Sequence, residues 1–244
     1  MTPEALPLLA LGVFVVAFLY SSVGHAGASG YIAVMSLMSM APATIKPTAL
    51  ALNVLVASIG AWQFWRAGHF CWQLFWPFAL LSVPLAWVGG YVALPSHVFH
   101  KLVGLVLLYS AMRFLVSPPP ESEPTAPPRA AALAIGGGIG LLSGLTGTGG
   151  GIFLTPILLF MHWARTKNAA AVSALFILVN SISGLLGTVT STGEFPPFAL
   201  VLVAAAGLGG VIGSRLGSRS FDPLRIKRLL AAVLLIAGAK LLLT

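Results

Sequence analysis

The chain has 244 residues, of which 58% are hydrophobic and only 7% are charged, and its formal net charge is +8. A soluble domain carries roughly 25% Asp, Glu, Lys and Arg, so this composition argues against a soluble enzyme, a secreted disulfide scaffold and a disordered protein. It predicts an all-α protein that spans a membrane several times. The single cysteine, Cys71, excludes an intramolecular disulfide and a metal site built from several cysteines.

The basic residues lie at the ends of apolar runs rather than together on one face. This placement is typical of residues that orient a membrane protein. We therefore expect the lipid bilayer as a partner and no nucleic acid, and we expect neither a cofactor nor a metal site. The first run, 5–22, lacks a preceding basic segment, so we interpret it as mature structure rather than a signal peptide.

Two apolar stretches of similar length flank a proline-rich segment that also holds two of the five acidic residues. We therefore predict a first transmembrane repeat at 1–116, a cytoplasmic linker at 117–129 and a second transmembrane repeat at 130–244. When one half is aligned on the other, Gly30 falls on Gly151, and Lys46 falls on Lys167 at the same spacing.

Each half contains five apolar runs, which gives four to five helical segments per repeat. They lie at 5–22, 31–43, 47–65, 72–93 and 98–116, and at 130–145, 152–163, 168–188, 196–214 and 224–243. Crossing a bilayer takes about 20 helical residues, and the third, fourth and fifth runs of each half reach that length. The second runs are too short, and each follows a glycine-rich break, so we predict discontinuous helices that start at these breaks.

The charge placement favours an inverted arrangement of the two repeats. If each half crosses the membrane an odd number of times, Lys46, Lys101 and Lys240 lie on one side and the other basic residues share the opposite side. An even number of crossings separates the basic residues slightly less well. The total number of crossings, between about six and ten, stays open.

All acidic residues lie outside the apolar runs: Glu4, Glu121, Glu123, Glu194 and Asp222. Carriers of protons and cations usually place a carboxylate inside the membrane. An anion needs no such group, because helix N-termini and hydroxyls can hold it. The composition therefore favours an anionic or neutral solute.

The two breaks, at 20–31 and 142–152, interleave glycines with hydroxyl residues. Non-helical backbone at membrane depth is tolerated only where it is buried or lines a cavity, and paired breaks in two halves indicate the binding site of a transporter. Two other glycine series have the spacing of close helix packing, to which we assign them: Gly136, Gly140 and Gly144, and Gly209, Gly213 and Gly217.

The break side chains and two amides inside the third runs are the candidate substrate-binding residues: Ser22, His25, Ser29, Asn53, Thr146, Thr148, Gly149, Gly150 and Asn180. His25 either donates to an oxyanion or bonds a backbone carbonyl. Each asparagine either lines the solute path or ties two helices together. Lys46 and Lys167 are interfacial anchors that snorkel, or alternatively charges that attract anions.

An enzyme interpretation rests on Gly27-Ala28-Ser29-Gly30, which matches the G-x-S-G nucleophile motif of rhomboid intramembrane proteases. The serine would need a histidine base at the same depth. Apart from His25, the histidines lie between the apolar runs, and a protease leaves the duplicated architecture unexplained. We therefore expect no catalytic residues, and keep the protease with Ser29 as nucleophile as an alternative.

Around the breaks the chain resembles the sulfite exporter TauE/SafE family, also called the toluene sulfonate uptake permease family. The resemblance rests on SVGHAGASGY at 22–31 and GLLSGLTGTGGG at 140–151, and extends over nearly the whole chain. The family pattern, G-x-G-G-G followed by apolar residues and proline, fits 147–156. The first break departs from it with His25, Ala26, Ala28 and Ser29.

The resemblance implies a bacterial inner-membrane carrier of sulfur-containing anions such as sulfite and sulfonates, often an exporter. With the residues, it predicts a secondary transporter that moves a small anion by alternating access. A passive anion channel is the other alternative. The solute's identity, the transport direction, coupling to protons or sodium and assembly into a homo-oligomer stay open.

Overall fold

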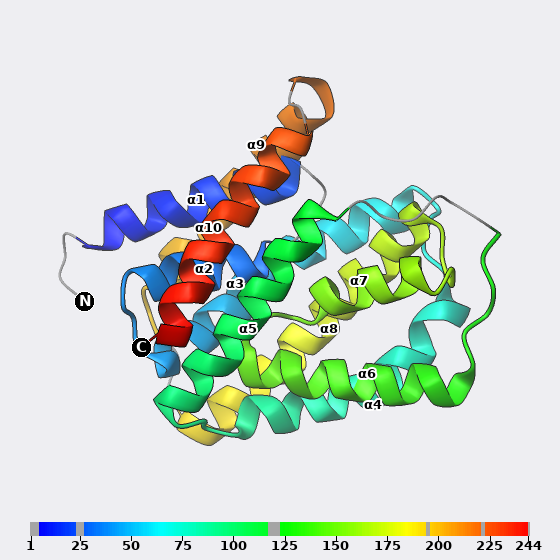
Figure 1. The fold of residues 1–244 in the computed structure, drawn as a ribbon, viewed down its shortest axis with the longest axis horizontal. Coiled ribbons are helices and arrows are strands. Elements are labelled where there is room, and N and C mark those ends of the chain that lie inside the picture. The colour runs from blue at the N-terminus through cyan, green and yellow to red at the C-terminus, as the bar shows by residue number, and fades with distance from the viewer. Residues whose placement is uncertain (1–4, 23–26, 117–122, 194–195, 221–222, 244) are drawn as a thin grey trace. The chain divides into compact units, whose positions relative to one another are not determined.

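The computed structural model describes residues 5–22, 27–116, 123–193, 196–220 and 223–243 (Figure 1). Within these ranges the regular structure is all helical, which confirms the predicted fold class. The helices are α1 (Ala5–Ser22), α2 (Ala28–Leu37), α3 (Pro42–Arg66), α4 (Trp72–Tyr91), α5 (Ser96–Leu115), α6 (Arg129–Thr146), α7 (Gly151–Phe160), α8 (Thr166–Thr192), α9 (Ala199–Ser220) and α10 (Pro223–Leu243).

Among the described residues, α3, α4, α5, α6 and α8 are long and apolar enough to cross a membrane. In contrast, α2 and α7 have only 10 residues each. At 1.5 Å per residue, such a helix covers about 15 Å, which is half the hydrocarbon core of a bilayer. Helices α2 and α7 overlap the two short runs predicted at 31–43 and 152–163, although α2 ends at Leu37 and the last residues of the run at 31–43 belong to α3.

The helices form two compact units, and each unit draws on both halves of the sequence. Unit 1 comprises 1–56, 94–116 and 195–244, and unit 2 comprises 57–93 and 117–194. Unit 1 thus contains α1, α2, the first part of α3, α5, α9 and α10. Unit 2 contains the end of α3 together with α4, α6, α7 and α8.

In unit 2, α4 packs against both α6 and α8, and Figure 1 shows α4 and α6 running alongside each other. The predicted glycine series allows the α4–α6 contact. A Cβ atom on Gly136, Gly140 or Gly144 would overlap carbonyl oxygens of α4, those of Phe78, Ser82 and Ala86 respectively. The assignment of this series to close helix packing is therefore confirmed.

In unit 1, α1 packs against α9 through the second series. A Cβ atom on Gly209 or Gly213 would overlap the carbonyl oxygens of Phe14 and Phe18 in α1. The side chain at Gly217 lies outside the described residues. In both units, the first helix of one sequence half packs against the fourth helix of the other half.

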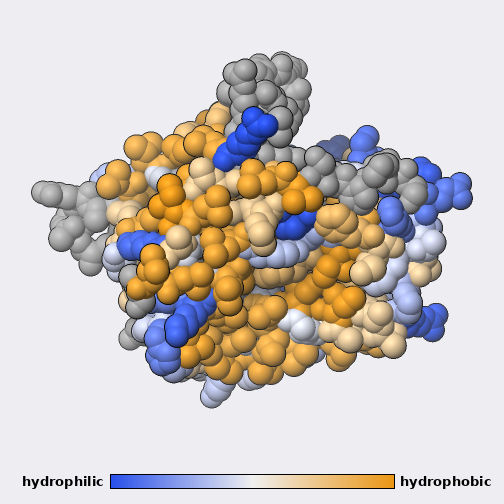
Figure 2. Space-filling view, in the orientation of Figure 1, coloured by the Kyte–Doolittle hydropathy of each residue, from blue (hydrophilic) through white to orange (hydrophobic). Residues whose placement is uncertain are grey.

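The surface is as hydrophobic as the composition requires. Hydrophobic residues dominate the face in Figure 2. The exposed large hydrophobic side chains of unit 1 include some from α5 and α10, namely Leu105, Met112, Leu229 and Ile236. Exposed apolar patches of this kind mark a surface that meets another apolar phase. For helices of this length, that phase is the lipid bilayer.

Candidate functional site

The second break has a left-handed backbone conformation that glycine adopts without strain. Helix α6 ends at Thr146, and Gly147, Gly149 and Gly150 then adopt left-handed φ angles of 84°, 75° and 82°. Helix α7 begins at Gly151, and its N-cap, Gly150, supplies no side-chain cap. The first N–H groups of a helix have no acceptors within the helix, so this end of α7 offers donors and a partial positive charge.

The two threonines of this break hydrogen-bond each other. Thr146 Oγ1 donates to the Leu142 carbonyl oxygen at 2.6 Å, so in its 3.0 Å contact with Thr148 it accepts the Thr148 proton. Both side chains are buried. Both hydroxyl protons are therefore used inside the break, where they hold the loop between α6 and α7 in its conformation.

Asn180, in the middle of α8, is completely buried. Its Oδ1 accepts a hydrogen bond of 2.8 Å from Ser82 Oγ in α4. Asn180 therefore ties two helices together, which is one of the two roles expected for it. Its buried Nδ2 has no hydrogen-bond partner, so the amide still offers both of its N–H donors.

Among the described residues of unit 2, two more buried hydroxyls lack hydrogen-bond partners: Ser143 Oγ in α6 and Ser181 Oγ in α8. Ser143 lies beside the N-cap of α7, because a Cβ atom on Gly150 would be 3.5 Å from Ser143 Cβ. An unsatisfied buried polar group costs on the order of 1–3 kcal/mol. Such groups beside a helix N-terminus are those that a bound anion would satisfy.

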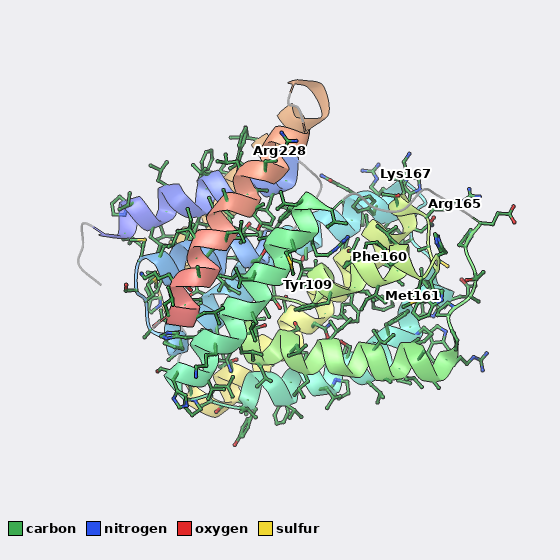
Figure 3. The ribbon with its side chains drawn as sticks, viewed as in Figure 1. Tyr109, Phe160, Met161, Arg165, Lys167 and Arg228 are labelled. Carbon is green, nitrogen blue, oxygen red and sulfur yellow. The ribbon has the colours of Figure 1, made fainter. Side chains whose placement is uncertain are left out.

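Basic residues lie close to the C-terminal end of α7 in unit 2. Phe160 and Met161 close this helix, and the exposed basic residues Arg165 and Lys167 follow at the start of α8 (Figure 3). Basic side chains near a helix end mark the membrane–water interface. Since α7 is about 15 Å long, its N-terminal break lies up to half a bilayer deeper than these residues.

The first break lies in unit 1. Gly27 is left-handed, with φ of 86°, and caps α2. Ser29 Oγ and the Tyr20 hydroxyl are 2.9 Å apart. The hydroxyl of the fully buried Tyr31 has no partner, and it would lie 2.9 Å from a Cβ atom on Gly27. This break therefore also combines a left-handed glycine with a buried donor.

The C-terminal end of α2 is held by Lys240 of α10. Its Nζ donates to the carbonyl oxygens of Ser36, at 3.2 Å, and Leu37, at 2.9 Å, and to Ser39 Oγ at 3.0 Å. A cation at a helix C-terminus is favourable because it meets the negative end of the dipole. The contact fixes the half-helix that follows the first break.

The candidate residues fall into three groups. Thr146, Thr148, Gly149 and Gly150 share one loop of unit 2, whose helix α8 carries Asn180. Ser29 and the buried Asn53 belong to unit 1. His25 and the side chain of Ser22 lie outside the described residues, so their contribution stays a prediction.

The sequence comparison paired Lys46 with Lys167, but their surroundings differ. Lys46 is only 8% exposed in unit 1, whereas Lys167 is an exposed residue of unit 2. Sequence reasoning passed over Ser143, Ser82 and Tyr31. All three are ordinary polar residues in apolar helices, and Ser143 lies within the break itself, which was the available signal. In the described part of the chain, no group of three His, Cys, Asp or Glu side chains could hold a metal ion.

These features describe a multi-pass α-helical membrane protein in which, among the described residues, a half-helix, α7, follows a glycine-rich break, a feature that transporters share. The profile of the family "Sulfite exporter TauE/SafE" matches residues 8–241. The chain belongs to this family.

Three related proteins are also described as probable membrane transporters. The chain is 42% identical to "Probable membrane transporter protein y4hK" of Sinorhizobium fredii, over 96% of this chain and 97% of that protein. It is 30% identical to "Probable membrane transporter protein YunE" of Bacillus subtilis over 45% of this chain and 40% of that protein. It is 24% identical to "Probable membrane transporter protein MJ0441" of Methanocaldococcus jannaschii over 98% and 96%. No solved structure matches the chain.

The family and its relatives are membrane transporters, not enzymes. The chain is therefore a multi-pass transporter of the inner membrane with a small solute as substrate, and the protease alternative is not supported.

Proposed function

We propose that the protein is a secondary transporter that exports a small sulfur-containing oxyanion, such as sulfite or a sulfonate, by alternating access. The observation that carries this proposal is the N-terminus of α7, which follows left-handed glycines and adjoins buried donors without partners. An acceptor-rich anion satisfies such donors, whereas a cation would add to their positive potential.

The candidate residues of unit 2 have two different roles in this proposal: some bind the solute and others hold the loop. The backbone of Gly149 and Gly150 leads into the α7 N-terminus, and Asn180 faces the solute path with its free amide donors. Thr146 and Thr148 keep the loop in its binding conformation through their mutual hydrogen bond. The depth available along α7, up to about 15 Å, supports a binding position near the middle of the bilayer.

The first break plays the corresponding role in unit 1. There Gly27 precedes the half-helix α2, Ser29 is held by Tyr20, and Asn53 lies buried in α3. We propose that Ser22 and His25 also contact the solute. The matching packing of α1 on α9 and of α4 on α6 supports an origin of the two sequence halves as repeats.

Counterflow in proteoliposomes tests the proposal. Purified protein is reconstituted with unlabelled sulfite, methanesulfonate, sulfate or acetate inside, and uptake of labelled sulfite is followed against protein-free liposomes. We expect saturable uptake that internal sulfite or methanesulfonate accelerates and acetate does not. The absence of saturable flux for every sulfur oxyanion would refute the proposal. Electrical current without counterflow would indicate the passive channel, and labelling of Ser29 by a serine-hydrolase probe would revive the protease.

A further inference from the structure

The described part of unit 2 offers donors on three helices, α6, α7 and α8, in addition to Ser181 Oγ of α8, which also lacks a partner. Ser143 Oγ belongs to α6 and Asn180 Nδ2 to α8, both fully buried and without partners. The third set is the N–H groups of Gly151 and Ile152 at the start of α7, since the Phe153 N–H already donates to the Gly150 carbonyl oxygen at 3.0 Å. The neighbouring hydroxyls are already used, since Ser82 donates to Asn180 and Thr148 donates to Thr146.

The packing around Gly150 brings Ser143 and the Phe176 turn of α8 to the N-terminus of α7. A Cβ atom on Gly150 would be 3.5 Å from Ser143 Cβ and 3.0 Å from the ring of Phe176 in α8. Asn180 lies one helical turn after Phe176 on the same face, and helical side chains lean toward the N-terminus of their helix. The Asn180 amide therefore leans toward the turn of α8 that borders the α7 N-terminus.

We infer that Ser143 Oγ and Asn180 Nδ2, together with the N-terminal N–H groups of α7, hold the three-oxygen headgroup of a sulfite or sulfonate, –SO₃⁻. The inference rests on the proposed function and assigns its headgroup site. Three donor directions from three helices match three acceptor oxygens, whereas a carboxylate has only two. The donors are neutral, so the anion's charge is met by the α7 dipole.

Ser143 differs in its hydrogen bonding from Ser110, a buried serine of unit 1. Ser110 in α5 is equally buried, but its hydroxyl donates to the Val106 carbonyl oxygen of its own helix at 2.7 Å. Ser143 Oγ makes no such bond. Replacing Ser110 with alanine removes a hydrogen bond from the empty protein, whereas replacing Ser143 removes only a buried donor that awaits a ligand.

Thermal unfolding of the purified full chain, with and without methanesulfonate, tests this assignment. In Ser143→Ala we expect an unfolding temperature without ligand that is equal to or above that of the wild type. We also expect a methanesulfonate affinity about tenfold to a hundredfold lower, the effect of one lost charge-assisted hydrogen bond. In the control Ser110→Ala, the temperature without ligand falls and the affinity is unchanged.

The outcomes separate this inference from the function on which it rests. If neither methanesulfonate nor sulfite raises the unfolding temperature of the wild type, and the wild type shows no sulfite flux, the oxyanion function and the headgroup site are both refuted. If the wild type is stabilised and Ser143→Ala responds like the wild type, only the headgroup site is refuted. A drop in the ligand-free unfolding temperature of Ser143→Ala as large as that of Ser110→Ala would also refute it, because the hydroxyl would then have a structural partner.

Discussion

The close contact between α4 and α6 can be tested with two glycines of α6, Gly138 and Gly140. They are two residues apart, but only Gly140 packs against α4. A Cβ atom on Gly140 would lie 2.6 Å from the Cα and Oγ atoms of Ser82, where real Cβ atoms essentially never approach within 3.0 Å. A Cβ atom on Gly138 would meet nothing within 4 Å. Both glycines are inside the same helix, so alanine improves the intrinsic helix propensity equally at both positions.

The magnitudes follow from these distances. In Gly140→Ala, α4 and α6 must separate by about 1 Å to restore ordinary contact, and overpacking of this kind costs about 1–3 kcal/mol. The shift also moves Ser82 away from Asn180, which it contacts at 2.8 Å. In Gly138→Ala, the gain in propensity stabilises the helix by about 0.5–1 kcal/mol.

Equilibrium unfolding of the two variants in mixed detergent micelles, with the wild type as reference, measures both effects. We expect the unfolding free energy to fall in Gly140→Ala and to rise in Gly138→Ala, with a difference of about 1–3 kcal/mol between them, which is the overpacking cost. Equal changes of the same sign in the two variants would refute the close packing of α4 on α6.

Two further predictions concern polar contacts. Lys240→Met removes the cation from the C-terminal end of α2 while keeping an apolar stem, and should lower the free energy of unfolding by about 1–2 kcal/mol. The control Lys101→Met, at an exposed position of α5, should leave this free energy unchanged. Equal effects of the two substitutions would contradict the role of Lys240. Ser82→Ala takes the donor from buried Asn180 Oδ1 and should cost about 1–3 kcal/mol of unfolding free energy. A Ser82→Ala protein as stable as the wild type would show that this hydrogen bond does not hold α4 to α8.

Features that depend on local pattern could be predicted from the sequence. The spacing of Gly136, Gly140 and Gly144 is a property of one helix, and it identifies a face that a second helix can approach closely. The short second runs, at 31–43 and 152–163, are likewise local features, because each is too short to span a bilayer and follows several glycines. The helix bounds around Gly150 agree with that expectation.

Partner choice between helices could not be predicted in this way. The run at 72–93 carries no signal that it packs on α6 and α8 rather than on its sequence neighbours, because lipid-facing and helix-facing positions are equally apolar. For the same reason, the sequence did not show that the compact units combine helices from both halves.

The sequence also could not predict which buried polar groups form hydrogen bonds. Thr146, Thr148 and Ser143 are all hydroxyl residues within a few positions of one break, and nothing in their order separates them. Only the structure shows that the threonines bond each other while Ser143 Oγ has no partner. Similarly, the tie between Ser82 and Asn180 joins positions 98 residues apart.

The most direct test of the central claim, that the second break binds the transported oxyanion, is sulfite counterflow in Gly150→Ala compared with Gly68→Ala. Both glycines are left-handed, with φ of 82° and 73°, so alanine adds roughly 1–2 kcal/mol of backbone strain at either position. Only at Gly150 would the added Cβ press on the site, at 2.8 Å from Ile139 Cγ2, while at Gly68 it meets nothing within 4 Å. We predict that counterflow falls about tenfold or more in Gly150→Ala and persists in Gly68→Ala. Equal counterflow in the two variants would contradict the claim.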